Sequence, residues 1–187
     1  MVRVEDALFL MDLARDTVQA ARVAPGQSCG LWVNISGGPL IKVSVSSSMP
    51  AWGTADFALS VDAGLFTREE ERHALMALAG TQANREILLP AGGRIPCGAV
   101  ADHLMCDGTP VFFPGGSRTG ESGGLWGTRP PFDTPFHFIH LAWRHVQRTG
   151  DYALLHHAAA GHALVDRLDR AFHATPADPD TGLVTCE

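Results

Sequence analysis

Two amphipathic segments joined by a three-residue corner constrain the fold of this chain more than any other feature of its sequence. Residues 134–148 and 152–172 each carry apolar side chains at helical spacing, which predicts one buried face for each segment. The corner between them is Thr149-Gly150-Asp151. Gly150 suits the left-handed position that ends a helix, and Asp151 suits the cap that begins the next one. The sequence therefore predicts two helices packed as a tight hairpin.

Three further helices are predicted ahead of this hairpin. Apolar residues recur at helical spacing over residues 4–22, and a Pro-Gly pair follows. A second helix is expected over residues 55–65, and a third begins at Thr67 and ends near residue 84. Thr67 and Glu70 have the spacing of a capping box, in which the threonine oxygen accepts from a backbone amide and the glutamate reaches back.

Two other regions lack helical spacing. Apolar residues alternate over residues 31–45 around a Gly-Gly-Pro turn, which predicts one short β-hairpin. Residues 89–131 are rich in glycine and proline, yet they contain aromatic residues that disordered linkers rarely carry, so an ordered functional loop is expected. Together these features predict an all-α fold, a single domain over residues 1–187, with helical hairpins and functional loops at one end, as in an α/α toroid.

The charge of the chain excludes several classes of partner. Its 187 residues carry a net charge of -6 and no basic patch, so neither a nucleic acid nor an anionic membrane is expected to bind. No apolar run is long enough to span a bilayer, and the first residues do not resemble a signal peptide. The sequence therefore predicts a soluble, cytoplasmic protein.

Metal and cofactor sites are not expected. Cys97, His103 and Cys106 fit no compact zinc spacing, and free thiols beside a loop histidine are the simpler interpretation. Histidines also recur on the two helices of the predicted hairpin, but without the carboxylate of an H-E-x-x-H arrangement. No phosphate-binding or dinucleotide-binding glycine motif is present in the right context.

The loop that precedes the helix at 134–148 has the chemistry of a carbohydrate site. It contains Trp126, Arg129 and Asp133. An indole can stack on the apolar face of a sugar ring, and a carboxylate and a guanidinium can hydrogen-bond its hydroxyl groups. The alternative is a buried tryptophan and an aspartate that only favours the helix dipole. The residue types alone do not separate these two interpretations.

A second cluster, with Trp52 and Asp56, begins the helix expected at 55–65. By itself it is best explained by a first-turn carboxylate that stabilises the helix N-terminus.

The order of five short motifs resembles the six-hairpin glycosidases, which include glucoamylase-like and trehalase-like enzymes. The resemblance covers about residues 50–187. The motifs are Gly53-Thr54-Ala55-Asp56, Leu125-Trp126-Gly127, Asp133-Thr134-Pro135, Arg148-Thr149-Gly150-Asp151-Tyr152 and Asp180-Thr181-Gly182-Leu183-Val184.

The resemblance implies the N-terminal part of an (α/α)6 barrel that hydrolyses O-glycosidic bonds by an inverting, two-carboxylate mechanism. Asp56, Trp126 and Asp133 match positions that line the sugar subsite, and Trp52 and Arg129 are their neighbours. Glu187 stands near the position of the catalytic acid, although a frayed terminal residue is the simpler interpretation. Ala55 replaces an arginine of the family pattern, which would alter sugar binding.

Whether the chain is itself an enzyme is left open, because the catalytic base would come from later helices. An incomplete barrel would expose helix faces, so self-association through them is expected. Two alternatives remain. One is a non-catalytic carbohydrate-binding or helical interaction module, and the other is a toroid enzyme such as a lyase or epimerase.

Overall fold

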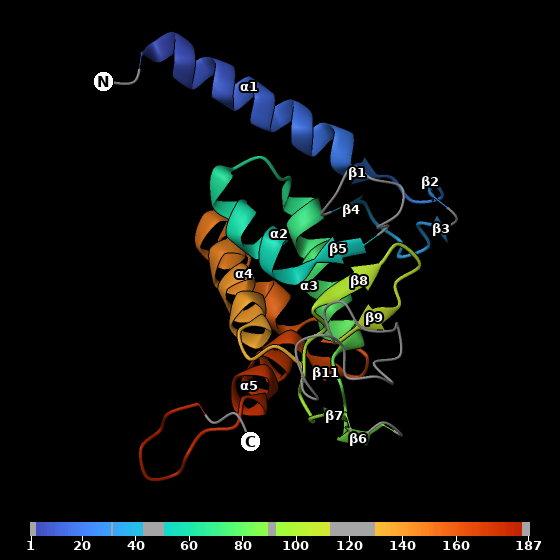
Figure 1. The fold of residues 1–187 in the computed structure, drawn as a ribbon, viewed down its shortest axis with the longest axis vertical. Coiled ribbons are helices and arrows are strands. Elements are labelled where there is room, and N and C mark those ends of the chain that lie inside the picture. Colours follow the sequence, from blue (N-terminus) through green and yellow to red (C-terminus); the bar gives the residue numbers. More distant parts are fainter. Residues whose placement is uncertain (1–2, 31, 43–50, 90–92, 113–129, 185–187) are drawn as a thin grey trace.

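The chain folds as a mixture of helices and short strands around one group of packed helices. The structure, a computed structural model, describes residues 3–30, 32–42, 51–89, 93–112 and 130–184. Within these residues there are five α-helices and eleven short strands, which pair in five small sheets. Figure 1 shows α2 to α5 packed together, with α1 crossing one end of this group and extending away from it. The helices are α1 (Val4–Ala21), α2 (Thr54–Ser60), α3 (Arg68–Thr81), α4 (Thr134–Thr149) and α5 (Leu164–Ala174).

The hydrophobic core lies between α2, α3, α4 and α5. Leu75 and Leu78 of α3, Phe138 and Leu141 of α4, and Leu164 of α5 are all buried in one cluster. Within α3 and α4 these side chains are three residues apart, so each helix turns one face inward. Full burial of a leucine or phenylalanine side chain contributes roughly 1.5–3 kcal/mol, so the contact between these helices stabilises the fold.

The predicted ends of two helices are confirmed. The Thr67 hydroxyl accepts a hydrogen bond from the Glu70 amide at 3.2 Å, and Glu70 Oε2 accepts one from the Thr67 amide at 2.8 Å. The C-cap of α4 is Gly150, which has a φ of 70° in the left-handed region. Asp151 caps the short 3-10 helix η2 (Tyr152–His156) by accepting from the Leu154 amide at 3.1 Å.

A three-stranded sheet positions the N-terminus of α2. Strand β5 pairs antiparallel with β8, and β8 pairs with β9. Because β5 runs directly into α2, the sheet and the helix share one buried corner, where Trp52 opposes Leu104 in the register. Between α3 and β8 in the sequence, strands β6 and β7 pair with each other as an antiparallel hairpin. The bounds are β5 (Ala51–Gly53), β6 (Ile87–Leu88), β7 (Arg94–Ile95), β8 (His103–Met105) and β9 (Pro110–Val111).

The strands near the N-terminus pair differently from the hairpin predicted at residues 31–45. Within its described residues, 32–42, the two halves of that segment do not pair with each other. Strand β3 pairs with β2, and β4 pairs with β1, so each half finds its partner earlier in the chain. The buried Asn34 side chain donates to the carbonyl oxygens of Val23 and Gly38 at 2.8 and 2.9 Å and joins the two pairs. The bounds are β1 (Arg22–Val23), β2 (Ser28–Cys29), β3 (Trp32–Val33) and β4 (Leu40–Ile41).

Helix α1 follows its predicted bounds but is covered only at its C-terminal end. Ala21 is buried and Val18 packs against the core, whereas Leu8, Phe9 and Met11 are exposed. No helix in the described part of the chain combines the length and the apolar character that crossing a membrane requires.

The single helix predicted over residues 152–172 was wrong. The segment contains η2, then the strand pair β10 (Ala158–Ala159) and β11 (His162–Ala163), and only then α5. Ala160 and Gly161 have φ values of 47° and 84°, which no α-helix accommodates. The Arg167 guanidinium donates to the carbonyl oxygens of Ala159 and Ala160, so these groups are unavailable for helical hydrogen bonds.

The predicted all-α fold and its (α/α)6 barrel are also wrong. Among the described residues, strands follow or precede every helix, and the described part of the glycine-rich and proline-rich region, residues 93–112, supplies β7, β8 and β9. These strands are two or three residues long. A period of two cannot be recognised over so few residues, so the pattern of the sequence indicated only loops there.

Candidate functional site

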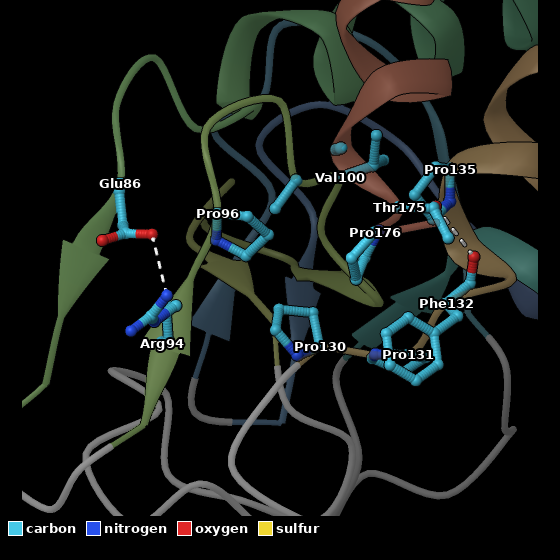
Figure 2. A pocket seen from close by; sticks show the side chains of 12 residues that line it. Glu86, Arg94, Pro96, Val100, Pro130, Pro131, Phe132, Pro135, Thr175 and Pro176 are labelled. Carbon is cyan, nitrogen blue, oxygen red and sulfur yellow. Dashed lines mark hydrogen bonds and ion pairs between the residues drawn. The ribbon is translucent and has the colours of Figure 1, made fainter. Parts of the chain in front are cut away.

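A pocket walled by prolines lies beside the N-terminus of α4, and we call it the proline pocket. Its volume is about 220 Å³. Figure 2 shows how three separate segments contribute its walls: the β6–β7 hairpin with the loop after it, the residues just before α4, and the residues just after α5. The lining residues are Glu86, Arg94, Pro96, Ala99, Val100, Pro130, Pro131, Phe132, Pro135, Ala174, Thr175 and Pro176.

Proline explains why these segments hold an open shape. A proline fixes φ and has no amide to pair, so it suits irregular segments and the first turn of a helix. Pro135 occupies that first turn in α4. On the side of the pocket near Pro135, the Thr175 hydroxyl donates to the Phe132 carbonyl oxygen at 3.4 Å, which joins the segment after α5 to the segment before α4.

The loop of Pro96 to Val100 is fastened to the helices by Gly98 and Gln82. The buried Gln82 amide nitrogen donates to the carbonyl oxygens of Gly98 and Arg167 at 2.9 and 2.8 Å. Gly98 has a φ of 86°, and a Cβ atom there would lie 2.4 Å from the Arg170 carbonyl oxygen. Only glycine therefore allows this wall of the pocket to lie so close to α5.

The pocket combines apolar walls with one charged pair. Arg94 Nη1 lies 3.6 Å from Glu86 Oε2, and both side chains are about half exposed. Phe132 is half-buried and offers a ring edge or face to a ligand, and the proline rings add further apolar surface. A ligand with an apolar face and several hydroxyl groups suits such a pocket, because the rings exclude water while the charged pair hydrogen-bonds.

Asp133, predicted to bind sugar, lies next to this pocket but not in its lining. It is the N-cap residue of α4, its side chain makes no capping hydrogen bond, and 71% of that side chain is exposed. Its Oδ2 lies 3.6 Å from His137 Nε2. The carboxylate is therefore accessible beside Phe132, which agrees with either of its two predicted roles.

Asp56 and Trp52 are not part of the proline pocket. Asp56 is exposed in the first turn of α2 and lines a different groove, of about 180 Å³, beside α1 and Lys42. Trp52 is 2% exposed and packs against Phe57 with 5.2 Å between ring centroids. The Trp52 indole thus has no exposed face in this structure, and its predicted sugar-binding role stays a prediction.

Three of the predicted site residues, Trp126, Arg129 and Glu187, lie outside the described residues. Their predicted roles stay predictions.

A buried cluster of charged groups joins α3 to α4. Glu71 is fully buried, and its two oxygens bind His145 Nδ1, at 3.0 Å, and the Arg148 guanidinium. Arg148 also donates to the Phe66 carbonyl oxygen at 3.3 Å. A buried carboxylate needs such partners, since an unpaired charge away from water is strongly unfavourable.

A second cavity, of about 290 Å³, borders this cluster on the side of the α4–η2 corner. His145 is 1% exposed, and its Nε2 has no hydrogen-bond partner and lies 4.0 Å from Asp151 Oδ2. Arg72 bridges Asp151, at 3.3 Å, and His157 Nδ1, at 2.6 Å. Positive and negative groups balance around this cavity, so its charge does not select one class of ligand. We interpret the Glu71 cluster as structural: it holds the α4–η2 corner against α3.

The sequence analysis predicted neither the proline pocket nor the buried Glu71 cluster, although the sequence contains a signal for the Glu71 cluster. Glu71 stands on the same helical stripe as Leu75 and Leu78, where a polar residue is unexpected. The proline pocket has no comparable signal, because its residues come from three distant segments.

The described cysteines and histidines form no group that could hold a metal ion. Cys97 is exposed and donates to the Asn84 carbonyl oxygen, while His103 Nδ1 pairs with Asp102 at 2.8 Å. Burial, followed by the neighbouring Cys29 thiol, raises the pKa of Cys106 to about 12. Among the described residues, no group of three or more histidine, cysteine, aspartate or glutamate side chains has the arrangement of a metal site.

Comparison of the chain with protein-family models, with curated proteins and with solved structures found no match.

Proposed function

We propose that this chain binds a carbohydrate in the proline pocket and that it belongs functionally with proteins of carbohydrate metabolism. The observation that carries the proposal is the lining of the pocket: apolar rings on several sides and the Glu86–Arg94 pair at one side. Sugars present C–H faces and hydroxyl groups together, and this combination distinguishes them from purely apolar or purely ionic ligands.

The position of the pocket agrees with the sequence motifs. Residues from the segments 130–135 and 174–176 line it. The first segment contains the Asp133-Thr134-Pro135 motif, and the second ends four positions before the motif that begins at Asp180. Asp133 adds an accessible carboxylate next to the Phe132 wall. A cytoplasmic location is part of the proposal, and it rests on the four sparse, irregularly spaced cysteines of the sequence, which do not form a disulfide framework pattern.

Hydrolysis of an O-glycosidic bond is the second candidate. The segment that leaves α5 forms one wall of the pocket and leads along the chain toward Glu187, the residue expected to act as the acid. Glu86 is the carboxylate among the pocket-lining residues, and an inverting mechanism requires two carboxyl groups. Binding is therefore the primary proposal and hydrolysis an addition to it.

The binding test is titration with trehalose, maltose and cellobiose, followed by saturation-transfer NMR and calorimetry. We expect one of these neutral disaccharides to bind, and Phe132→Ala to weaken binding about tenfold, which corresponds to about 1.4 kcal/mol. Tyr152→Ala is the matched control, because Tyr152 is an aromatic side chain that is 64% exposed and outside the pocket. Absence of binding at millimolar sugar, or equal effects of the two variants, would refute the proposal.

The hydrolysis test measures release of reducing sugar or glucose from the disaccharide that binds. Turnover that disappears in Glu187→Gln while binding persists would support the second candidate. Binding without turnover would leave carbohydrate binding as the function.

A further inference from the structure

The cavity at the α4–η2 corner contains hydrogen-bonding groups that the fold itself does not use. The net charge of its lining selects no ligand, but the placement of its donors and acceptors does. Its volume of about 290 Å³ is many times the roughly 30 Å³ that one water molecule occupies in the liquid, so a small organic molecule fits. The cavity lies between the first turns of α3 and the last turns of α4, and its lining residues are Arg68, Glu69, Arg72, His145, Thr149 and Asp151.

The buried imidazole of His145 has one nitrogen that no protein group satisfies. Nδ1 donates to Glu71 Oε2 at 3.0 Å, whereas Nε2 has no hydrogen-bond partner among the described residues, although His145 is only 1% exposed. Arg148 already balances the charge of Glu71, so the imidazole serves Glu71 as a neutral donor and keeps a lone pair on Nε2. A buried acceptor without a donor is unfavourable, so a ligand that donates a hydrogen bond to Nε2 is stabilised in this cavity.

A second acceptor lies close to this nitrogen. Asp151 Oδ2 is 4.0 Å from His145 Nε2, which is too far for a direct hydrogen bond. One nitrogen atom with two N–H bonds, at about 2.9 Å from each acceptor, spans this gap, whereas an alcohol has only a single O–H to donate. Thr149 does not compete for either acceptor, because its hydroxyl donates to the His145 carbonyl oxygen at 2.7 Å. The two acceptors therefore favour an amino group that carries hydrogens.

The α3 side of the cavity offers a guanidinium group for an anion. Arg68 and Arg72 are four residues apart, so they lie on the same face of α3. Arg72 is engaged with Asp151, at 3.3 Å, and with His157, at 2.6 Å. The side chain of Arg68 is exposed and has no hydrogen bond or ion pair in the part of the chain that the structure describes. A guanidinium binds a carboxylate through two parallel N–H donors, so Arg68 is available for a ligand carboxylate.

The balance of charge around the cavity matches a ligand that carries both signs. The lining contains two guanidinium groups and two carboxylates, on Arg68, Arg72, Glu69 and Asp151. A simple anion would meet both carboxylates, and a simple cation would meet both guanidinium groups, so each would experience repulsion as well as attraction. In a zwitterion each charge can face the opposite charge of the lining.

We propose that this cavity binds a free α-amino acid. Its ammonium group donates to His145 Nε2 and Asp151 Oδ2, and its carboxylate accepts from Arg68. The Nδ1 side of His145 holds the corner through Glu71, while the Nε2 side recognises the ligand. The proposal does not depend on the proline pocket or on its carbohydrate.

The experiment is a titration of isotope-labelled full-length protein with each of the twenty common amino acids, up to about 10 mM. Calorimetry measures affinity, and nitrogen NMR follows the resonance of His145 Nε2, which moves when this atom accepts a hydrogen bond. We expect at least one amino acid to bind with a Kd below about 1 mM and to shift this resonance. If no amino acid shifts it, the cavity holds only water and the proposal is overturned.

Three derivatives of the amino acid that binds separate the groups of the ligand. The N-trimethyl derivative keeps both charges but has no N–H, the N-acetyl derivative loses the positive charge, and the amide loses the carboxylate. We expect each derivative to bind at least about tenfold more weakly, because each leaves a group of the cavity unpaired. A trimethyl derivative that binds as tightly as the parent would contradict the role of His145 Nε2.

Two variants test the protein side of the contact. Arg68→Gln removes the guanidinium group, and Asp151→Asn replaces Oδ2 by a donor while it keeps Oδ1, which caps η2 at the Leu154 amide. We expect each to weaken binding about tenfold, with an unchanged circular dichroism spectrum. The matched control is Arg85→Gln, since Arg85 is exposed and lies outside the cavity lining. Equal affinities of the Arg68 and Arg85 variants, or full affinity in Asp151→Asn, would overturn the proposal.

Discussion

His145 Nδ1 donates a hydrogen bond to Glu71 Oε2 across 3.0 Å, and this contact joins α4 to α3 over 74 positions of the chain. An ionised carboxylate only accepts, so the imidazole must carry its proton on Nδ1. Arg148, three residues after His145, binds the other oxygen of Glu71. One buried carboxylate thus holds two side chains from the last turns of α4 and fixes where the α4–η2 corner lies against α3.

Replacing Glu71 tests the importance of this cluster. Glu71→Ala leaves His145 and Arg148 without their buried partner, so we expect the free energy of unfolding to fall by about 3–5 kcal/mol. Urea denaturation followed by circular dichroism measures the change. Glu69→Ala is the control, because Glu69 is exposed two residues earlier on the same helix and should change stability by less than about 0.5 kcal/mol. Similar losses in the two variants would refute this role.

The Glu70–Arg22 ion pair predicts a dependence of stability on pH. Burial raises the pKa of Glu70, but hydrogen bonds from Arg22 Nε, at 2.5 Å, and from the Thr67 amide outweigh it and hold the pKa below its usual value. A group whose pKa is lower in the folded state stabilises the protein above its unfolded pKa, and this stabilisation is lost as the pH falls through the folded pKa.

We therefore expect the wild type to be more stable than Glu70→Gln at pH 6, and the difference to shrink as the pH falls below about 4.3, the ordinary glutamate value. Urea denaturation of both proteins at pH 6, 5, 4 and 3 measures it. A difference that stays constant over this series would contradict the assignment. Asp16→Asn, which changes an exposed carboxylate on α1, is the matched control for a change in net charge.

Substitution of Gly98 by alanine is expected to lower the stability of the protein and to distort the proline pocket. In Gly98→Ala the new methyl group would lie 2.4 Å from the Arg170 carbonyl oxygen, at a φ of 86° that alanine disfavours. We expect a loss of about 3 kcal/mol or more, the combined effect of backbone strain and displacement of the loop from α5. Gly26→Ala is the control, since Gly26 has a φ of 78° but open space around it and should lose only about 1 kcal/mol. Equal losses would show that conformational strain alone acts at Gly98. Thermal unfolding measures both variants.

Predictions that depended on neighbouring residues were confirmed. The capping box of Thr67 and Glu70, the left-handed Gly150 and the cap by Asp151 all formed as the sequence indicated. Each of these helix caps involves only a few consecutive residues, so the local sequence contains every hydrogen-bonding group that the cap needs. The helices at α3 and α4 follow from the same kind of signal, an apolar stripe repeated over several turns.

Predictions that required long-range information failed at particular residues. The helix predicted across residues 152–172 is interrupted because Arg167 binds the carbonyl oxygens of Ala159 and Ala160, a contact that no local pattern reveals. The burial of Trp52 was not predicted either, because it depends on the pairing of β5 with β8. The proline pocket combines residues from positions 86–100, 130–135 and 174–176, and only packing brings these segments together.

The sequence by itself determined the caps, the principal helices and the acidic, patch-free charge of this protein, because these properties depend on residue type and on spacing within one or two turns. Only the tertiary structure decided that short strands pair across the chain, that Glu71 meets His145 and Arg148, and that prolines from three segments enclose a pocket. Strand pairing and burial depend on contacts between segments that are far apart in the sequence. Their free energy comes mainly from the exclusion of water between those segments, so it cannot be read from any one segment alone.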